Sequence, residues 1–373
     1  MTQPLGGNYG GIMQAWALQQ VLKHMGHEPV TIDRQPKAPS AAYKLARLGY
    51  RAALKAVGKR NAPINFERHF PIIFKNTQKF IENRIARSEP LLSTSALQKH
   101  FETINYDAVI VGSDQTWRPM YSPNILDYYL NFLNNDKIKK ISYASSFGVD
   151  HWEYNEEQTQ ECQKLAEKLD AISVRETSGV ELCSKYLRVS AELTLDPTLL
   201  LTSQDYLSRL NITITSKNPS KLFTYYLDSD INKNEVATRI AETLNLIPFT
   251  SQPSVKLSIG SHKNLDDYTF PKVENWIKAF NDAEFIVTDS FHGCVFSIIF
   301  NKPFLVFSNT ERGGARFKSL LKLFDLEDRL IASQEDAQNK CLQCIDWYKV
   351  NRLLDSYKTS SLDFLRKNLE DVG

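Results

Sequence analysis

The stretch that decides the fold is residues 285–297, which read FIVTDSFHGCVFS. Its first four residues are β-branched or aromatic and predict a buried strand. A turn at Asp289 and Ser290 follows, and a helix is predicted to begin directly after it. His292 then lies in the first helical turn, where free N–H groups and the helix dipole favour an anion. There it could bind phosphate or donate a proton near neutral pH. Alternatively, it simply packs beside a helix start that Asp289 and Ser290 cap.

The same alternation of strand and helix extends outward in both directions. Apolar runs rich in β-branched residues predict strands at 29–33, 108–111, 141–144, 171–174, 193–195, 222–227, 246–249, 285–288 and 304–307. Helical periodicity is clearest at 11–25 and 346–369. Near-continuous apolar strands are typical of parallel sheets that are covered on both faces. Since a polar stretch at 211–221 divides the series, we expect an α/β protein with two doubly wound, Rossmann-like domains, residues 1–215 and 216–373, facing each other across a cleft.

Length and composition fit this architecture and exclude several classes of protein. A chain of 373 residues suits two domains, and 42% hydrophobic with 24% charged residues is ordinary for a globular protein. The formal charge of +2 is too balanced for a general nucleic-acid binder. No apolar run reaches transmembrane length, and the N-terminus lacks the layout of a signal peptide. The 5 cysteines form a sparse, odd set that is unlike a secreted disulfide framework. We therefore expect a cytoplasmic protein.

Charged residues follow several predicted strands, at the ends where parallel α/β sheets bind ligands. Arg312 and Arg316 flank a Gly-Gly turn, which suits a phosphate or carboxylate, although a solvated basic loop is the alternative. Asp114 could accept a proton from a hydroxyl or merely cap a helix. Arg175 could bind an anion or pair with a nearby acid. These loops are the candidate site.

Two further patterns, a glycine-rich turn and a pair of cysteines, are weaker evidence for a ligand site. The turn from Gly6 to Gly11 lets a ligand approach the backbone, but it is not the GxGxxG dinucleotide fingerprint. Cys341 and Cys344 lack the second pair of ligands that a structural zinc site needs. The sequence also contains no Walker loop, G-x-S-x-G elbow or HExxH motif. We expect neither a metal nor another cofactor.

One segment, residues 34–66, is strongly basic and contains no Asp or Glu. Five of its basic residues step by three or four and so share one helical face: Lys44, Arg47, Arg51, Lys55 and Lys59. Leu45, Leu48, Ala52 and Ala56 form a neighbouring stripe. This pattern is typical of an amphipathic helix that contacts anionic lipid or a lipid-diphosphate substrate. A solvated face packed on the first domain is the alternative.

Short blocks spread over nearly the whole chain together resemble the polysaccharide pyruvyl transferase family. They are GNYGG (7–11) with QAWAL (14–18), GSDQTW (112–117), YASSFG (143–148), SVRE (173–176), LDPTL (195–199), TDSFHG (288–293) and the Arg316-Phe317 helix. The resemblance implies a GT-B-like pair of α/β domains. It also implies transfer of a pyruvyl ketal from phosphoenolpyruvate to two hydroxyls of a sugar, with phosphoenolpyruvate as co-substrate and no metal.

The resemblance also implies roles for individual residues. His292 matches the histidine of the family's R-x-H-G segment, which is associated with phosphoenolpyruvate and proton donation, whereas Ser290 stands where the family has arginine. Our hypothesis is that Arg316 supplies the missing charge. We expect phosphoenolpyruvate on the 216–373 side, at Arg175, Ser290, Phe291, His292, Arg312 and Arg316. We expect the acceptor sugar on the 1–215 side, at Asn8, Tyr9, Gly10, Asp114, Gln115 and Trp117, with Asp114 as the candidate base.

The expected acceptor is a sugar of a cell-surface polysaccharide or its lipid-linked precursor. Segment 34–66 would then give peripheral contact with the inner face of the membrane, and no nucleic-acid partner is expected. One alternative is a GT-B glycosyltransferase with a nucleotide-sugar diphosphate at residues 312–318. Another is a carbohydrate-binding partner of a polysaccharide-synthesis complex, with Tyr9, Trp16 and Trp117 as sugar platforms.

Overall fold

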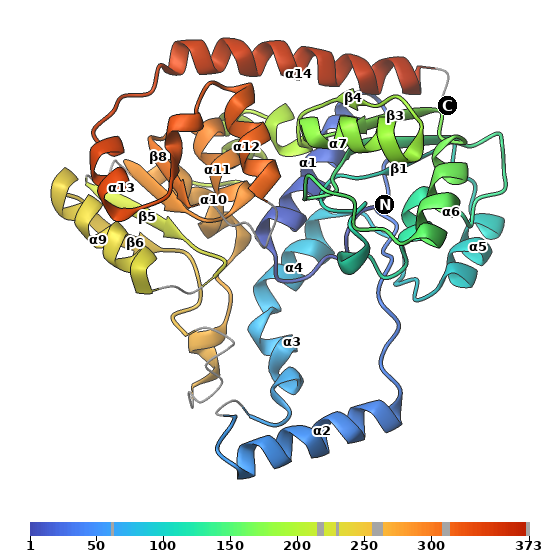
Figure 1. Cartoon of the computed structure of the whole chain (residues 1–373), viewed down its shortest axis with the longest axis horizontal. Coiled ribbons are helices and arrows are strands. Elements are labelled where there is room, and N and C mark those ends of the chain that lie inside the picture. The colour runs from blue at the N-terminus through green and yellow to red at the C-terminus, as the bar shows by residue number, and fades with distance from the viewer. Residues whose placement is uncertain (61–62, 215–219, 229–230, 256–263, 308–313, 371–373) are drawn as a thin grey trace.

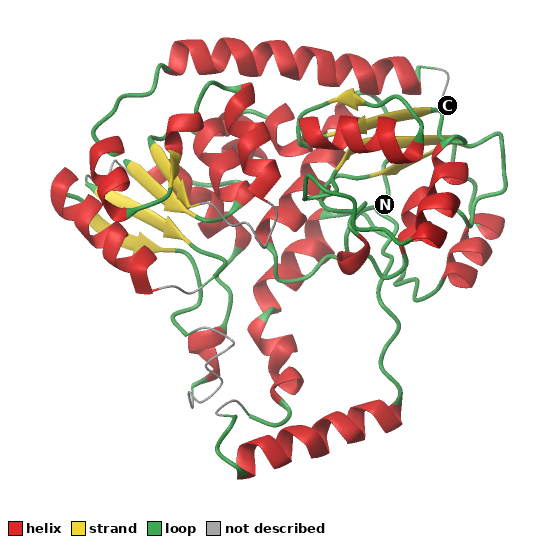
Figure 2. Cartoon of the chain, in the orientation of Figure 1, coloured by secondary structure: helices red, strands yellow, loops and turns green. Residues whose placement is uncertain are grey.

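A computed structural model describes residues 1–60, 63–214, 220–228, 231–255, 264–307 and 314–370. Two sheets of parallel strands lie side by side, each with helices around it (Figures 1 and 2). The first sheet falls within residues 108–193 and the second within 221–331. This arrangement confirms the predicted α/β class. The predicted boundary between residues 215 and 216 falls where residues 215–219 lie outside the described part, and it stays a prediction.

The first sheet has the order β1-β2-β3-β4, and all of its pairs are parallel. Its strands are β1 (Ala108–Val111), β2 (Lys139–Ser145), β3 (Ala171–Val174) and β4 (Glu192–Leu193). The helices of this half are α1 (Tyr9–His24), α2 (Ala41–Ala56), α3 (Phe70–Ile73), α4 (Lys75–Arg84), α5 (Thr94–Thr103), α6 (Glu156–Ala166), α7 (Thr177–Leu182) and α8 (Ser203–Arg209). Because all four strands run the same way, the loops that follow them meet at one edge.

The second sheet has the order β6-β5-β7-β8-β9, also with parallel pairs only. Its strands are β5 (Lys221–Tyr225), β6 (Ile247–Thr250), β7 (Phe285–Thr288), β8 (Phe304–Phe307) and β9 (Leu330–Ile331). The helices are α9 (Ile231–Leu244), α10 (Val273–Asp282), α11 (Phe291–Ile299), α12 (Gly314–Leu323), α13 (Gln334–Lys340) and α14 (Trp347–Leu369). The order reverses between β5 and β7. Ligands bind at such a switch point in doubly wound sheets, and the loop to His292 leaves β7 there.

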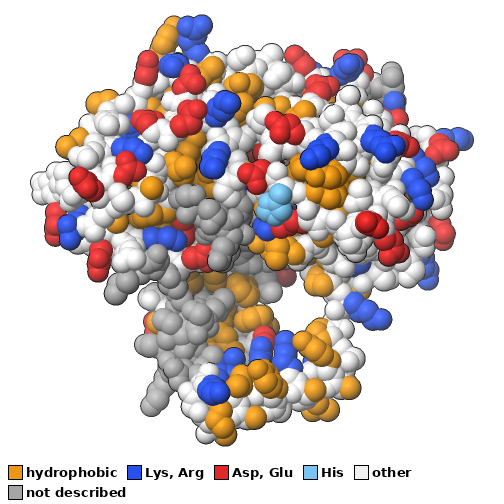
Figure 3. Space-filling model, in the orientation of Figure 1, with side chains coloured by type: hydrophobic (Ala, Val, Ile, Leu, Met, Phe, Trp, Pro, Cys, Tyr) orange, Lys and Arg blue, Asp and Glu red, His pale blue; other side chains and the backbone are white. Residues whose placement is uncertain are grey.

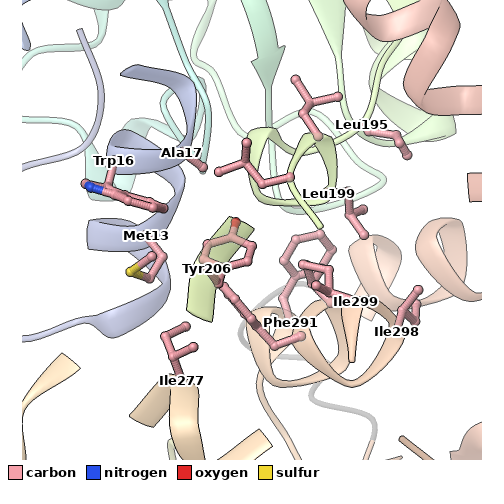
Figure 4. Packing of buried hydrophobic residues seen from close by; sticks show 14 of the residues in the cluster. Met13, Trp16, Ala17, Leu195, Leu199, Tyr206, Ile277, Phe291, Ile298 and Ile299 are labelled. Carbon is pink, nitrogen blue, oxygen red and sulfur yellow. The ribbon is translucent and has the colours of Figure 1, made fainter. Parts of the chain in front are cut away.

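Alternate residues of the strands serve different hydrophobic cores. In β7, Phe285 and Val287 pack into a core confined to the second half, whereas Ile286 faces a large core that both halves share. Helix α1 lies in that shared core and is buried on nearly every side. Figure 4 shows Met13 and Trp16 of α1 on one side of Tyr206, and Phe291, Ile298 and Ile299 on its other side. The halves are therefore packed together rather than merely joined.

Several predicted strands differ from the structure in their bounds, since those expected at 141–144, 222–227 and 246–249 are observed as Lys139–Ser145, Lys221–Tyr225 and Ile247–Thr250. The strand expected at 29–33 is wrong, because the described chain forms only isolated bridges there, from Thr31 to Arg87 and from Arg34 to Leu91. The strand expected at 193–195 is displaced to Glu192–Leu193. In contrast, the helix expected at 11–25 is observed as Tyr9–His24, and the long closing helix as Trp347–Leu369.

Helix α2 stands away from the body of the molecule, below the two halves in the view of Figure 1, and Figure 3 shows open space beside it. None of its residues is buried. Among the described helices, none has the length and apolar character to span a membrane. Helix α14 instead runs along both halves (Figure 1), and its Ser361 Oγ accepts a hydrogen bond of 2.9 Å from Leu195 N.

Candidate active site

Three charged residues from the ends of three strands of the first sheet form a buried ionic cluster. Arg175, just after β3, donates from Nη1 to Asp196 Oδ2 at 2.6 Å and from Nη2 to Asp114 Oδ1 at 3.0 Å. Asp114 follows β1 and Asp196 follows β4. Because parallel strands end at the same edge, residues that are far apart in sequence meet here.

The loop that carries Asp114 is held by neighbouring polar groups. Gln14 of α1 accepts a 3.1 Å hydrogen bond from Ser113 N through Oε1, and Ser113 Oγ donates to Asp196 Oδ2 at 2.9 Å. Asp114 itself has a left-handed backbone with φ 69. Aspartate tolerates that conformation better than most residues, although it is uncommon outside glycine. The surroundings therefore fix the direction of this carboxylate.

In the second half, the turn after β7 is anchored by its own polar residues. Asp289 accepts hydrogen bonds from Leu227 N at 2.6 Å and from Lys233 Nζ at 2.7 Å. Ser290 caps α11, since its Oγ accepts from Gly293 N at 3.3 Å. The capping interpretation thus holds for Ser290, whereas Asp289 ties the end of β7 to the loop after β5. Neither role engages His292.

His292 brings the second half into contact with the cluster. Its Nε2 lies 3.7 Å from Asp196 Oδ2, within the range of an ion pair but longer than a hydrogen bond. On the other side of the ring, a Cβ added to Gly10 would lie 2.1 Å from Nδ1. The N-termini of α1 and α11 therefore meet at His292, and only a glycine in α1 leaves room for the imidazole.

Two guanidinium groups lie over the ring of Phe291. The Cζ atoms of Arg175 and Arg316 are 4.5 Å and 5.3 Å from its centroid, which is the geometry of cation–π contacts. Arg316, in the first turn of α12, also places Nη1 4.0 Å from Asp114 Oδ1. The structure thus brings together five predicted site residues from both halves: Asp114, Arg175, Phe291, His292 and Arg316.

Burial and charge together shift the pKa values of this cluster. Burial alone would raise the pKa of Asp196, but His292 and Arg175 outweigh it and hold that pKa well below its usual range. Burial likewise opposes ionisation of Asp114, yet Arg175, His292 and Arg316 lower its pKa. Burial and the charge of Arg175 lower the pKa of Arg316 to about 10. Both carboxylates are therefore ionised at neutral pH, and an added anion would stabilise the charge of Arg316.

Buried polar atoms of this region that have no hydrogen-bond partner among the described residues include Arg175 Nε, Glu176 Oε2 and His292 Nε2. The first two face each other at 3.9 Å, which is ion-pair distance but too long for a hydrogen bond. Glu176 is otherwise engaged, because its Oε1 accepts from Ser146 Oγ at 2.6 Å and from Gly148 N at 2.9 Å. Buried polar atoms are rarely left without partners. Their gathering beside one ionic cluster indicates a place for a polar ligand.

Other predicted site residues lie outside the ionic cluster or make contacts that stabilise the fold. Tyr9 stacks on Trp276 with ring centroids 5.3 Å apart, and Trp117 is stacked on Tyr129 in the interior, so neither ring is exposed as a sugar platform. Asn8 is exposed and caps α1 through a 3.1 Å hydrogen bond from Gly10 N. Gln115 is half-buried, and its Oε1 accepts a 3.3 Å hydrogen bond from Arg118 Nη1. Arg312 lies outside the described residues.

Sequence reasoning missed Asp196 and Glu176 as members of the site. A signal was available, because each follows a predicted strand in the same way as Asp114 and Arg175. A cavity of about 1020 Å³ lies away from this cluster. It lies along the open edge of β1, between α1 and residues 26–32, and none of the clustered charged side chains lines it. We therefore place the candidate active site at the buried ionic cluster, because its charged groups suit an anionic ligand, rather than at the cavity.

Comparison with known proteins adds to this geometry. A UDP-GlcNAc 2-epimerase from Neisseria meningitidis, solved with UDP-GlcNAc, aligns with 12% identity and a TM-score of 0.54 over 98% of this chain and 99% of its own. That similarity concerns the fold alone and confirms the predicted GT-B-like pair of α/β halves. A mutant O-GlcNAc transferase from Thermobaculum terrenum aligns over 100% of this chain and 69% of its own, at 10% identity and a TM-score of 0.40, which supports no argument.

Sequence comparison is more specific. A search of curated proteins finds no match. The family model described as polysaccharide pyruvyl transferase, however, matches residues 8–311. The match spans most of the chain and takes in Asp114, Arg175, Asp196 and His292. We conclude that the chain belongs to the polysaccharide pyruvyl transferase family.

Proposed function

We propose that this enzyme transfers a pyruvyl group from phosphoenolpyruvate to a sugar of a cell-surface polysaccharide or of its lipid-linked precursor. The products are a pyruvate ketal and inorganic phosphate. The observation that carries the proposal is the meeting of His292, Arg316 and Phe291 from one half with Asp114, Arg175 and Asp196 from the other. This cluster supplies an imidazole, two cations and ionised carboxylates at one place.

The reaction needs each of these groups. A proton added to the methylene carbon of phosphoenolpyruvate converts it to a methyl group and leaves an oxocarbenium-like centre at the neighbouring carbon. One sugar hydroxyl adds to that centre and loses its proton. A second hydroxyl then displaces phosphate and closes the ketal, and its proton leaves with the phosphate. The site must therefore hold an acid, a group that accepts hydroxyl protons, and cations for the phosphate and carboxylate.

We assign these roles to residues of the cluster. His292 is the acid, and Asp114, which is ionised, is the base that accepts the proton of the acceptor hydroxyl. Arg316 binds the anionic donor in place of the arginine that Ser290 replaces. Arg175 donates to carboxylates from Nη1 and from Nη2, so its main role is to position Asp114 and Asp196.

The same proposal covers where each substrate binds, the need for a cofactor and the place of the reaction in the cell. We place phosphoenolpyruvate on the side of residues 216–373 and the acceptor on the side of residues 1–215. The cations of Arg175 and Arg316 and the N-terminus of α11 supply positive charge at the site, and on that basis we propose a reaction without metal or other cofactor. The reaction would take place in the cytoplasm, at the inner face of the membrane, with no nucleic acid involved.

Ligand-dependent thermal unfolding tests the donor without knowledge of the acceptor. A ligand at 100 times its dissociation constant stabilises a protein by about 2.7 kcal/mol. We expect phosphoenolpyruvate to raise the melting temperature, and Arg316→Ala to abolish that rise. Lys318→Ala is the matched control, because Lys318 lies in the same helix but is exposed.

Other outcomes would overturn this function. Stabilisation by a nucleotide sugar alone would indicate a glycosyltransferase with the same fold. Binding of sugars without release of phosphate from phosphoenolpyruvate, and without any effect of His292→Ala, would indicate a carbohydrate-binding protein. Release of phosphate that depends on both phosphoenolpyruvate and an acceptor sugar would support the proposal.

A further inference from the structure

Helix α2 presents an apolar face to solvent. Its exposed hydrophobic side chains are large: Tyr43 is 59% exposed, Leu45 69%, Tyr50 66%, and Val57 at the C-cap 66%. Between them lie Ala46, Gly49, Ala53 and Ala56, which are also exposed. Contiguous apolar surface of this kind on a helix usually marks a site of interaction.

The opposite face of α2 is turned toward the rest of the chain. Arg51 donates to Glu67 Oε2 at 2.8 Å, and Arg47 Nη1 lies 3.6 Å from Glu67 Oε1. These contacts fix which way the helix faces, since they hold the side that carries Arg47 and Arg51 inward. The face with Leu45, Gly49 and Ala56 lies opposite and must point outward. The sequence pattern alone could not give this orientation.

The structure also divides most of the basic residues of segment 34–66 into two groups. Arg34 is buried and bonded to Asp127 at 2.7 Å, and Arg47 and Arg51 are engaged by Glu67. Four lysines remain exposed, and no ion pair to them is found among the described residues: Lys37, Lys44, Lys55 and Lys59. Lys44 and Lys55 lie next to Arg51 around the helix, at the border between the inward face and the apolar arc. Tyr43 and Tyr50 border that arc at its other end. The arrangement is apolar at the centre, aromatic at one margin and cationic at the other.

We propose that the outward face of α2 docks on an anionic lipid bilayer, with the helix lying in the plane of the interface. Leu45 and the small residues around it would enter the acyl boundary. Tyr43 and Tyr50 would sit at the level of the headgroups, as interfacial aromatic residues do. Lys44 and Lys55, at the border with the inward face, would extend their long side chains to the anionic headgroups. This inference concerns the partner of α2 and does not depend on the identity of the donor.

Charge favours a lipid surface over a second copy of the chain. Segment 34–66 contains no acidic residue, so two copies of α2 would bring lysines together without carboxylates from the same segment to balance them. An anionic surface supplies the missing charge. The apolar face is also rich in alanine and glycine, so its affinity for a neutral bilayer should be weak. Strong binding should require the added attraction between the lysines and anionic headgroups.

Vesicle co-sedimentation of the full chain tests this inference. We expect binding to vesicles of phosphatidylglycerol mixed with phosphatidylcholine, weaker binding in high salt, and little binding to phosphatidylcholine alone. Each basic residue near such a surface contributes about a fivefold change in affinity. The double variant Lys44→Glu with Lys55→Glu should therefore reduce binding by at least about 25-fold. Lys137→Glu with Lys168→Glu is the matched control, because these lysines are exposed elsewhere on the first half.

A second pair of changes separates insertion from simple attraction of charges. Leu45→Ser with Tyr50→Ser keeps every charge, and both side chains are exposed, so the melting temperature should not change. We expect this variant to lose binding to anionic vesicles. Retained binding would overturn insertion of the apolar face. Equal loss in the Lys137 and Lys168 control, or no binding by the unaltered chain, would overturn docking through α2. A dimer in sedimentation equilibrium that the serine variant dissociates would assign the face to a second copy.

Discussion

Replacing Gly10 by alanine should displace the His292 imidazole without removing any functional group. A Cβ at Gly10 would lie 2.1 Å from His292 Nδ1 and 2.4 Å from Cγ. Ordinary van der Waals contact begins at 3.4 Å, so the ring or the two helices must move apart by about 1.3 Å. Misplacement of a catalytic group by 1 Å can cost about 10²-fold in rate. We expect Gly10→Ala to lower turnover by roughly that factor.

The effect on stability should be smaller than the effect on activity. Alanine is favoured over glycine inside a helix by about 1 kcal/mol, whereas overpacking of a well-filled site costs about 1–3 kcal/mol. These contributions oppose each other, so we expect the free energy of unfolding to fall by no more than about 2 kcal/mol. Urea unfolding at neutral pH measures it, and the folded variant can then be assayed.

Gly11→Ala is the matched control, one position further along α1. Its added Cβ would have Asn8 Nδ2 as nearest neighbour at 3.6 Å, which is an ordinary contact. It should keep near-native turnover and gain slightly in stability. The assay is release of phosphate from phosphoenolpyruvate in the presence of an acceptor sugar. If Gly10→Ala and Gly11→Ala were equally active, the contact between α1 and His292 would not set the position of the catalytic group.

Three further predictions concern the charged cluster. His292→Gln should lower turnover by about 10²–10⁴-fold, whereas His151→Gln, at an exposed position, should not change it. Arg316→Ala should remove the stabilisation that phosphoenolpyruvate gives in thermal unfolding, and Lys318→Ala should retain it. Because the pKa of Asp196 is lowered by folding, its stabilising contribution is present above its unfolded value of 3.8 and is lost as the pH falls below that value. Asp196→Asn should therefore flatten the acid limb of a plot of urea midpoint against pH, and an unchanged acid limb would contradict this.

Much of the fold follows from local sequence patterns. The strands Ala108–Val111, Ala171–Val174, Phe285–Thr288 and Phe304–Phe307 were predicted with the bounds that the structure shows. Each is a short run made mostly of apolar and β-branched residues, which is a strong local signal for a strand. The run at 29–33 has similar composition, yet it forms only isolated bridges. A strand forms there only if a neighbouring strand is available for pairing, and the composition of the segment does not determine that.

The candidate site was predictable in outline but not in its connections. Asp114, Arg175 and His292 could be found because charged residues that follow parallel strands converge at one edge. That Arg175 binds both Asp114 and Asp196 could not be found, because the lengths of the intervening loops do not determine which side chains meet. Tyr9 was predicted to contact a sugar, but the large shared core provides Trp276 as its partner. The sequence alone does not show that a side chain of α1 is buried when the residue that covers it comes from the other half of the chain.

The shared core limits how the two halves can move. Enzymes built from two α/β halves often open and close by rotation about a hinge. Here Tyr9 and Trp276 are almost fully buried against each other across the halves, and Tyr9 Oη also donates a 2.7 Å hydrogen bond to the carbonyl of Pro271. Exposing such an aromatic pair would cost on the order of 5 kcal/mol. Wide separation of the halves is therefore disfavoured, and substrates should reach His292 through rearrangement of the loops around a site that is already assembled.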